Sequence, residues 1–119
     1  GSAIISVPSL ANGATATGTV TLPGIGLLTR VEMNRAGWFT LYASTAAATA
    51  DAARGVLVEP AKGSGVIADP RLAAAGVQNM NPFESIRSEE SPSTTLYPWR
   101  FKNEGTSGAV LIVLTYVSL

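Results

Sequence analysis

The sequence predicts an all-β protein: an antiparallel β-sandwich, jelly-roll-like, with seven or eight strands and one short helix. Two observations lead to this prediction. Runs of alternating apolar and polar residues recur at intervals of roughly 10 to 15 residues, and clusters of turn-forming residues separate them. The 119 residues suit one domain with its own core, which we place at residues 3–119. Gly1 and Ser2 are expected to be the remnant of a cleaved expression tag.

Three strands are expected in the first third of the chain. Ala3 to Val7 is a short apolar run that Pro8 closes. Thr15 to Leu22 alternates threonine with small or apolar residues, which predicts a strand with one face in water. Ile25 to Met33 alternates as well, and its expected inward residues are Ile25, Leu27, Val31 and Met33.

A hairpin is expected next, because only Asn34-Arg35 separates this third strand from Ala36 to Ala43. The two faces of the second hairpin strand carry Trp38, Thr40 and Tyr42 on one side and Phe39 and Leu41 on the other. Since both faces are bulky, we expect a central strand whose tryptophan side is either sandwich core or a covered surface.

One helix is expected, from Ser44 to Arg54, because alanine dominates this stretch. Ser44 or Thr45 can cap its start, Arg54 complements the dipole at its end, and Gly55 can terminate it. A short alanine-rich helix has little stability of its own, so we expect it to lie on the sheet.

The second half of the chain is less regular. Short strands are expected at Val56 to Glu59, Val66 to Ala68 and Gly76 to Met80. The stretch from Gln78 to Ser93 is expected to be mainly surface loops, and any recognition function is expected there and on the strand that follows. That strand, Thr94 to Lys102, contains Pro98 and should lie at an edge, or be bulged or kinked. Ala109 to Val117 is apolar on both faces and is the expected central strand of the core sheet.

The composition disfavours most kinds of chemistry. Eight basic and eight acidic residues give no net charge, so we expect no nucleic-acid partner. The longest apolar runs are far shorter than the roughly 20 residues of a membrane helix, so no membrane insertion is expected. The chain has neither histidine nor cysteine, which removes the commonest general base and the commonest ligands of transition metals. We therefore expect a protein that is not an enzyme, with no catalytic residue, cofactor or metal ligand.

The carboxylates offer two alternatives to that view. Glu89-Glu90 is the only adjacent pair, and solvated loop charge explains it better than acid–base catalysis does. A calcium site built from Asp51, Asp69 and loop carbonyls is conceivable, but no aspartate-rich spacing supports it.

Aromatic residues offer a possible binding surface. The ligand platform would consist of Trp38, Tyr97, Trp99 and Arg100, since aromatic rings stack on the apolar faces of sugars. The competing interpretation is core packing, which a sandwich of this size also requires. Trp99, beside Pro98, is the aromatic residue expected to be most exposed.

The stretch from Leu27 to Asp69 resembles a group of small structural proteins of tailed-bacteriophage virions. The residues that carry the resemblance are Leu41-Tyr42, Ser44 to Ala48, Asp51-Ala52-Ala53-Arg54, Pro60, and Gly65-Val66-Ile67-Ala68-Asp69, together with Asn103, Ser107-Gly108 and Leu114-Thr115-Tyr116 near the end. Gly37-Trp38-Phe39 departs from the group's pattern, which has a more polar strand there, and Gln78 to Pro92 matches none of it.

The resemblance implies a β-sandwich on the surface of the virion, in capsid decoration, a tail fibre or the tail tip. Its implied partners are other virion proteins and further copies of itself, with a trimer favoured among homo-oligomers. The alternative is a carbohydrate-binding module for host attachment, which would bind a host surface glycan through the ligand platform.

Overall fold

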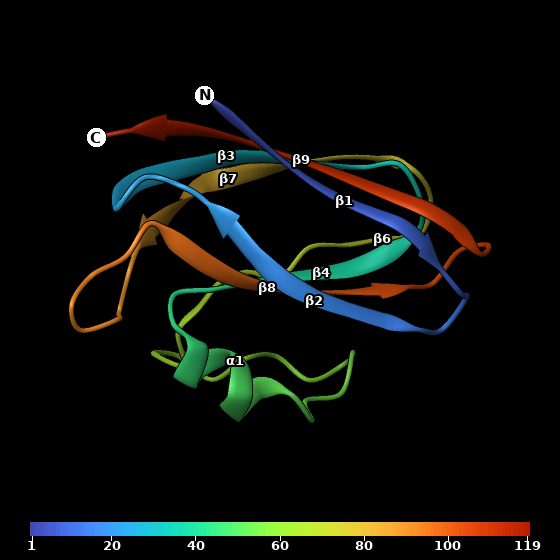
Figure 1. Ribbon diagram of the computed structural model, residues 1–119, viewed down its shortest axis with the longest axis horizontal. Helices are drawn as coiled ribbons and strands as arrows, with labels where there is room; N and C mark the ends of the chain where they lie inside the picture. Colours follow the sequence, from blue (N-terminus) through green and yellow to red (C-terminus); the bar gives the residue numbers. More distant parts are fainter.

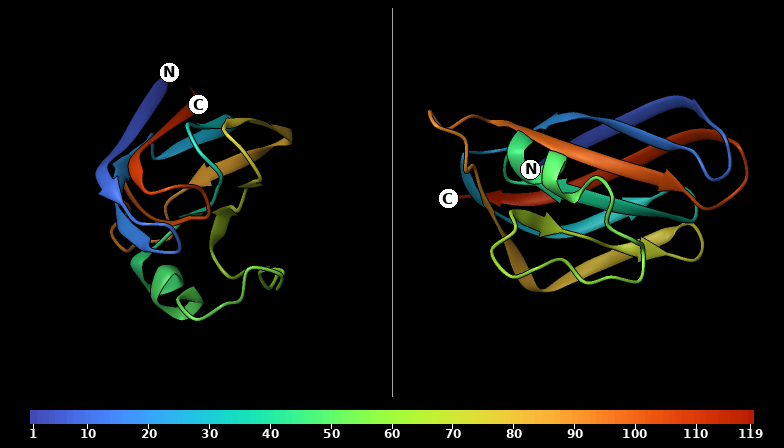
Figure 2. Two further views of the ribbon diagram at one scale, coloured as in Figure 1. Left: turned by 90° about the vertical axis from the view of Figure 1, so that its right-hand side faces the viewer. Right: turned by 90° about the horizontal axis from the view of Figure 1, so that it is seen from below.

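The chain forms two antiparallel sheets packed face to face, with one short helix outside them (Figure 1). The computed structural model describes residues 1–119. The first sheet contains, in spatial order, β1 (Ser2–Leu10), β9 (Gly108–Ser118), β3 (Ile25–Met33) and β7 (Gly76–Arg87). The second sheet contains β2 (Thr15–Thr21), β8 (Leu96–Asn103), β4 (Gly37–Tyr42) and β5 (Val66–Ala68), and β6 (Arg71–Leu72) also pairs with β4. The helix α1 (Thr45–Asp51) and the segment after it lie on the outer side of the second sheet (Figure 2).

The prediction of an all-β antiparallel sandwich with one short helix is confirmed. Consecutive strands alternate between the two sheets up to β4, β5 and β6 stay beside β4, and β7, β8 and β9 alternate again. Two four-stranded sheets connected in this way have the strand order of a jelly roll, provided that β5 and β6 are counted as one strand interrupted at Asp69-Pro70.

The expected hairpin at Asn34-Arg35 is wrong, because β3 and β4 belong to different sheets. The Asn34 side chain accepts a hydrogen bond from the Leu111 amide at 2.9 Å and donates one to the Ala109 carbonyl at 3.1 Å. Arg35 Nε donates to the same Ala109 carbonyl at 2.9 Å. These side chains bind the backbone of β9, and the chain then crosses to the other sheet.

A β-bulge in β3 changes which residues reach the core. The strand pairing slips between Leu28 and Arg30, which places one extra residue in β3. Val31 and Met33 point inward as predicted, but the bulge turns Leu28 inward, and Leu27 and Ile25 face outward instead of the core. A one-residue slip moves every preceding side chain to the opposite face.

Two expectations about the central strands have different outcomes. β9 lies between β1 and β3, so its predicted central position is confirmed. β8 is not an edge strand, because it lies between β2 and β4. Its pairing with β4 ends at Trp99, however, so Pro98 has a strand neighbour only on the β2 side, where it lies opposite Thr19. Pro98 has no amide hydrogen to donate, and it lies just beyond the last residue of β8 that pairs with β4, so no hydrogen bond of the β4–β8 pairing is lost.

The segments after β4 also differ from expectation. Ser44 caps α1, its hydroxyl accepting a hydrogen bond from the Ala47 amide at 3.0 Å, but the helix ends at Asp51, three residues before Arg54. Val56 to Glu59 forms turns instead of a strand. The stretch from Gln78 to Arg87 belongs to β7, not to a set of loops, and only residues 88–95 connect it to β8. No helix in the structure is long and apolar enough to cross a membrane.

Candidate interaction surfaces

A cluster of charged and aromatic side chains fills the space between α1 and the second sheet. We call it the ion cluster; its members are Trp38, Thr40, Tyr42, Asp51, Arg54, Asp69 and Arg100. The tryptophan side of β4 is thus a covered surface, one of the two alternatives that the sequence left open. Phe39 and Leu41, on the other face of β4, are fully buried in the core between the sheets.

Arg54 holds the ion cluster together. Its guanidinium binds Asp51 through Nε at 2.6 Å and Asp69 through Nη1 at 3.0 Å, and the same Nη1 donates to the Val58 carbonyl at 2.7 Å. Asp51 and Asp69 do come together, as the calcium alternative required. Arg54 provides the positive charge between them, so these carboxylate oxygens are already bound within the chain.

The guanidinium groups of two arginines stack on the ring of Trp38. The guanidinium carbons of Arg54 and Arg100 lie 5.1 and 4.7 Å from the ring centroid. Arg100 also donates to the Asp51 carbonyl at 3.1 Å, which connects β8 to the end of α1. The cluster therefore joins the helix to three strand segments and leaves little of the Trp38 ring free.

The contacts of the ion cluster shift the pKa values of Asp51, Arg54 and Tyr42. Burial alone would raise the pKa of the Asp51 carboxyl, but hydrogen bonds from Arg54 and Tyr42 and the charges of Arg54 and Arg100 hold the pKa below its ordinary value. Burial alone would lower the pKa of Arg54, and its two carboxylate partners raise the pKa instead. Burial, followed by the hydrogen bond to Asp51, raises the pKa of Tyr42. None of these groups is poised to exchange a proton near pH 7, as a general acid or base would be.

The four residues of the predicted ligand platform do not share one surface. Tyr97 and Trp99 face the core, with 0% and 7% of their surfaces exposed. Arg100 alternates with Trp99 along β8 and shares the opposite face with Trp38. The expectation that Trp99 is exposed is wrong: at 7% it is slightly more exposed than Trp38 and Tyr97, but it is buried, because its strand is internal and its side chain lies between the sheets.

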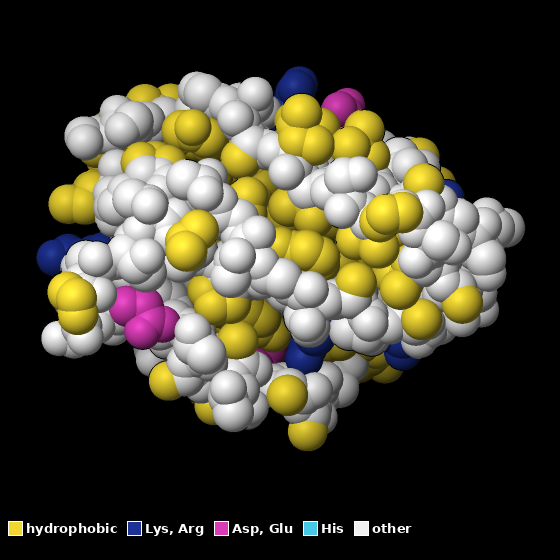
Figure 3. Space-filling view, viewed as in Figure 1, with side chains coloured by type: hydrophobic (Ala, Val, Ile, Leu, Met, Phe, Trp, Pro, Cys, Tyr) yellow, Lys and Arg dark blue, Asp and Glu magenta, His cyan; other side chains and the backbone are white.

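A groove runs between the edge strands β1 and β2, where the sandwich is open. Figure 3 shows hydrophobic side chains in this hollow. The groove has a volume of about 550 Å³, and it is lined by Ser2 to Ser6, by Thr19 to Thr21 and by Trp99. The indole Nε1 of Trp99 is buried and has no hydrogen-bond partner. Gly18 lies beside this indole, and a side chain there would collide with it.

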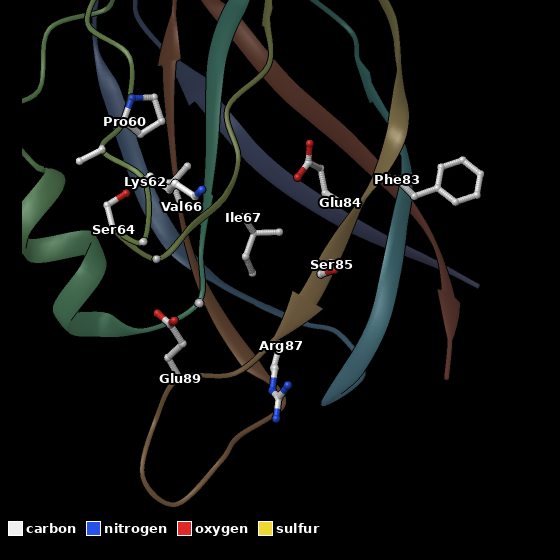
Figure 4. Close-up of a pocket in the computed structure, with 14 residues that line it drawn as sticks. Pro60, Lys62, Ser64, Val66, Ile67, Phe83, Glu84, Ser85, Arg87 and Glu89 are labelled. Atoms are coloured by element: carbon white, nitrogen blue, oxygen red, sulfur yellow. The ribbon is translucent and has the colours of Figure 1, made fainter.

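A second groove, of about 510 Å³, lies at the opposite open side, between β7 and the loop before β5 (Figure 4). Glu84 points from β7 toward the loop that carries Lys62, whereas Phe83 points to the other side of the strand. Glu84 and Lys62 form no ion pair. Ile67 is one of the hydrophobic residues that line the groove.

The outer face of the first sheet is uncovered. No helix or loop lies over it, whereas α1 and its following segment lie over the second sheet (Figures 1 and 2). Its outward aliphatic residues are Ile4, Ile25, Leu27, Val77, Leu111, Val113 and Val117, five of them exposed and Leu27 and Val113 half-buried. Ile4 is the most exposed of the seven, at 64%. Inspection of the sequence missed this surface, although Ala109 to Val117 carries the signal, being apolar on both faces.

No protein-family model and no curated protein sequence matches this chain. The functional interpretation therefore depends on the surfaces described above and on the resemblance in the sequence.

Proposed function

We propose that this chain is a non-enzymatic structural protein of a tailed-phage virion, which decorates the capsid or projects as part of a fibre or tail. In this role its partners are other virion proteins and further copies of itself.

The observation that carries the proposal is the uncovered aliphatic face of the first sheet. Large contiguous apolar patches are uncommon on soluble monomers and usually mark surfaces that another molecule covers. The second sheet has no such face, because α1 and the ion cluster close it. A two-sheet module with one closed side and one apolar side is suited to packing against a neighbouring subunit.

The residues of the phage-like pattern support the same proposal. Tyr42, Asp51, Arg54 and Asp69 come from three separate parts of that pattern, and all four belong to the ion cluster. Residues of the pattern therefore hold the segment that contains α1 against the second sheet. A pattern with such a role would be shared by proteins with the same framework, even where their exposed residues differ.

The carbohydrate-binding alternative has no comparable observation in its favour. Stacking on a sugar needs an accessible aromatic face. Two arginines stack on Trp38, and Tyr97 and Trp99 are buried.

The proposal can be tested on purified phage particles. Antibodies raised against the chain should label the surface of intact virions from the source culture, and peptides of the chain should appear in mass spectra of those particles. An antibody against an unrelated cytosolic protein of the host provides the control. If the chain occurs only in the host-cell fraction, the proposed virion role is wrong.

A further inference from the structure

We propose that the outer face of the first sheet binds a second copy of this chain, related by a two-fold axis that lies between the two facing sheets, parallel to them and perpendicular to β3 at the level of Val31. This inference rests on the proposed function, because it names the partner of the surface from which that function was argued.

Two charged residues lie at the centre of this face. Arg30 and Glu32 point outward from β3, on either side of the inward-facing Val31. Neither forms an ion pair within the chain. Their cross-strand neighbours are uncharged: Thr115 and Asn79 beside Arg30, and Val113 and Val77 beside Glu32.

The order of these two charges makes the face complementary to itself. A two-fold axis across β3 at Val31 reverses the direction of the strand in the second copy, so Arg30 of each copy lies opposite Glu32 of the other. Two such pairs then form per dimer. An axis running along β3 would instead bring Glu32 against Glu32, and like charges in contact across an interface are strongly unfavourable.

The surface beside Glu32 has room for the side chain of Arg30 from the second copy. A hollow of about 380 Å³ beside Glu32 is lined by Leu111 and Val113. The aliphatic stem of Arg30 from the second copy can pack on these residues while its guanidinium reaches the carboxylate. The rotation also brings the Leu111 end of the face against the Val117 end, so that apolar residues cover one another.

The size of the face indicates a weak, reversible dimer. Four strands about 4.8 Å apart and about nine residues long cover roughly 19 by 30 Å, or about 600 Å² per copy. The total is near the lower end of the range for specific interfaces, about 1,200 Å². Association should therefore be measured over a wide range of concentrations.

Sedimentation equilibrium on the full chain, from about 1 μM to 1 mM, tests the proposal. The wild-type chain should show a monomer–dimer equilibrium. Arg30→Glu and Glu32→Arg should each raise the dissociation constant of the dimer at least tenfold. Each substitution replaces both Arg30–Glu32 contacts of the dimer with a pair of like charges. The double variant, which carries both substitutions, should restore the dimer.

Mixing the two single variants gives the sharpest result. One variant has two acidic residues at the centre of the face and the other has two basic ones, so together they should form a heterodimer, detectable by native mass spectrometry. Lys62→Glu and Glu59→Arg provide the matched control, because they change the net charge equally on an exposed loop away from this face. Each control variant should dimerise as the wild type does, and mixing the two should give mixed dimers only in the statistical proportion, with no preference over the homodimers.

Several outcomes would overturn the two-fold contact. These are a monomer at every concentration, an oligomer that the single reversals leave intact, a double variant that fails to recover, or the trimer that the resemblance favours. Failure here is distinguishable from failure of the proposed function. A monomeric chain that is present in virions would remove only the dimer, and a dimer that is absent from virions would remove only the virion role.

Discussion

The indole nitrogen of Trp38 donates a hydrogen bond of 2.7 Å to Oδ1 of Asp69. This bond joins β4 to the break between β5 and β6, and Thr40 donates to the same oxygen at 2.7 Å. With Arg54 bound to both Asp69 and Asp51, the contact connects the helix segment to the sheet that supports it.

Substituting Asp69 should destabilise the whole domain. Asp69→Ala leaves the buried guanidinium of Arg54 and two hydrogen-bond donors short of a partner. Removing one member of a buried ion pair typically costs 3–5 kcal/mol, and we expect about 2–4 kcal/mol because Asp69 is partly exposed. Urea unfolding measures the change. Glu59→Ala, on an exposed loop, is the control and should stay within about 0.5 kcal/mol of the wild type.

The two tryptophans should respond differently to the same substitution. Trp38→Phe removes a hydrogen bond to a charged partner and weakens stacking with two arginines, at a cost of about 2–3 kcal/mol. Trp99→Phe loses ring volume, but it also removes a buried donor that has no partner, so its cost should be lower by about 1 kcal/mol. Unfolding curves of the two variants decide the order, and an equal or larger loss for Trp99→Phe would contradict the assigned contacts.

Stability should fall in acid, in part through Asp51. The folded state lowers the pKa of this carboxyl, so its contribution is complete above the unfolded pKa of about 3.9 and is lost as the pH falls through the folded value. The free energy of unfolding, measured at pH 7, 5 and 3, should therefore decrease more steeply for the wild type than for Asp51→Asn. Parallel curves would show that Asp51 does not titrate differently in the folded state.

A second carboxyl should contribute to the acid response in the same direction. The hydrogen bond from Arg71 holds the pKa of Glu104 below its ordinary value. Its partner Arg71 is about half exposed, so Glu104→Gln should flatten the pH dependence less than Asp51→Asn does. The same urea titrations measure both variants.

Gly37 should not tolerate even a methyl group. A Cβ at this position would overlap the ring of Phe101, which is fully buried, and would lie 2.8 Å from the Lys102 carbonyl oxygen. We expect Gly37→Ala to cost about 2–3 kcal/mol or more, the range for overpacked cores. Gly24→Ala is the matched control, because nothing lies within 4 Å of its Cβ position, and thermal unfolding should show little change.

Local sequence patterns correctly predicted the elements that depend only on residues close together in the sequence. The threonine alternation of β2 and the capped alanine helix follow from side-chain periodicity and hydrogen bonding within a few residues. Local sequence patterns failed where contacts with a segment distant in the sequence determine the path of the chain. Asn34 and Arg35 resemble a hairpin turn, but they bind the backbone of β9, more than 70 residues away in the sequence.

The sequence by itself determined the class of fold, because the period of its apolar residues and the chemistry of its turns act locally. It also limited the available chemistry, since histidine and cysteine are missing from the composition. Only the tertiary structure decided which residues of β3 face the core and which face of each strand is covered. A one-residue bulge reverses the faces of a strand, and pairing with strands distant in the sequence determines which of those faces is covered. For the same reason only the folded chain reveals the uncovered outer face, with Arg30 and Glu32 at its centre.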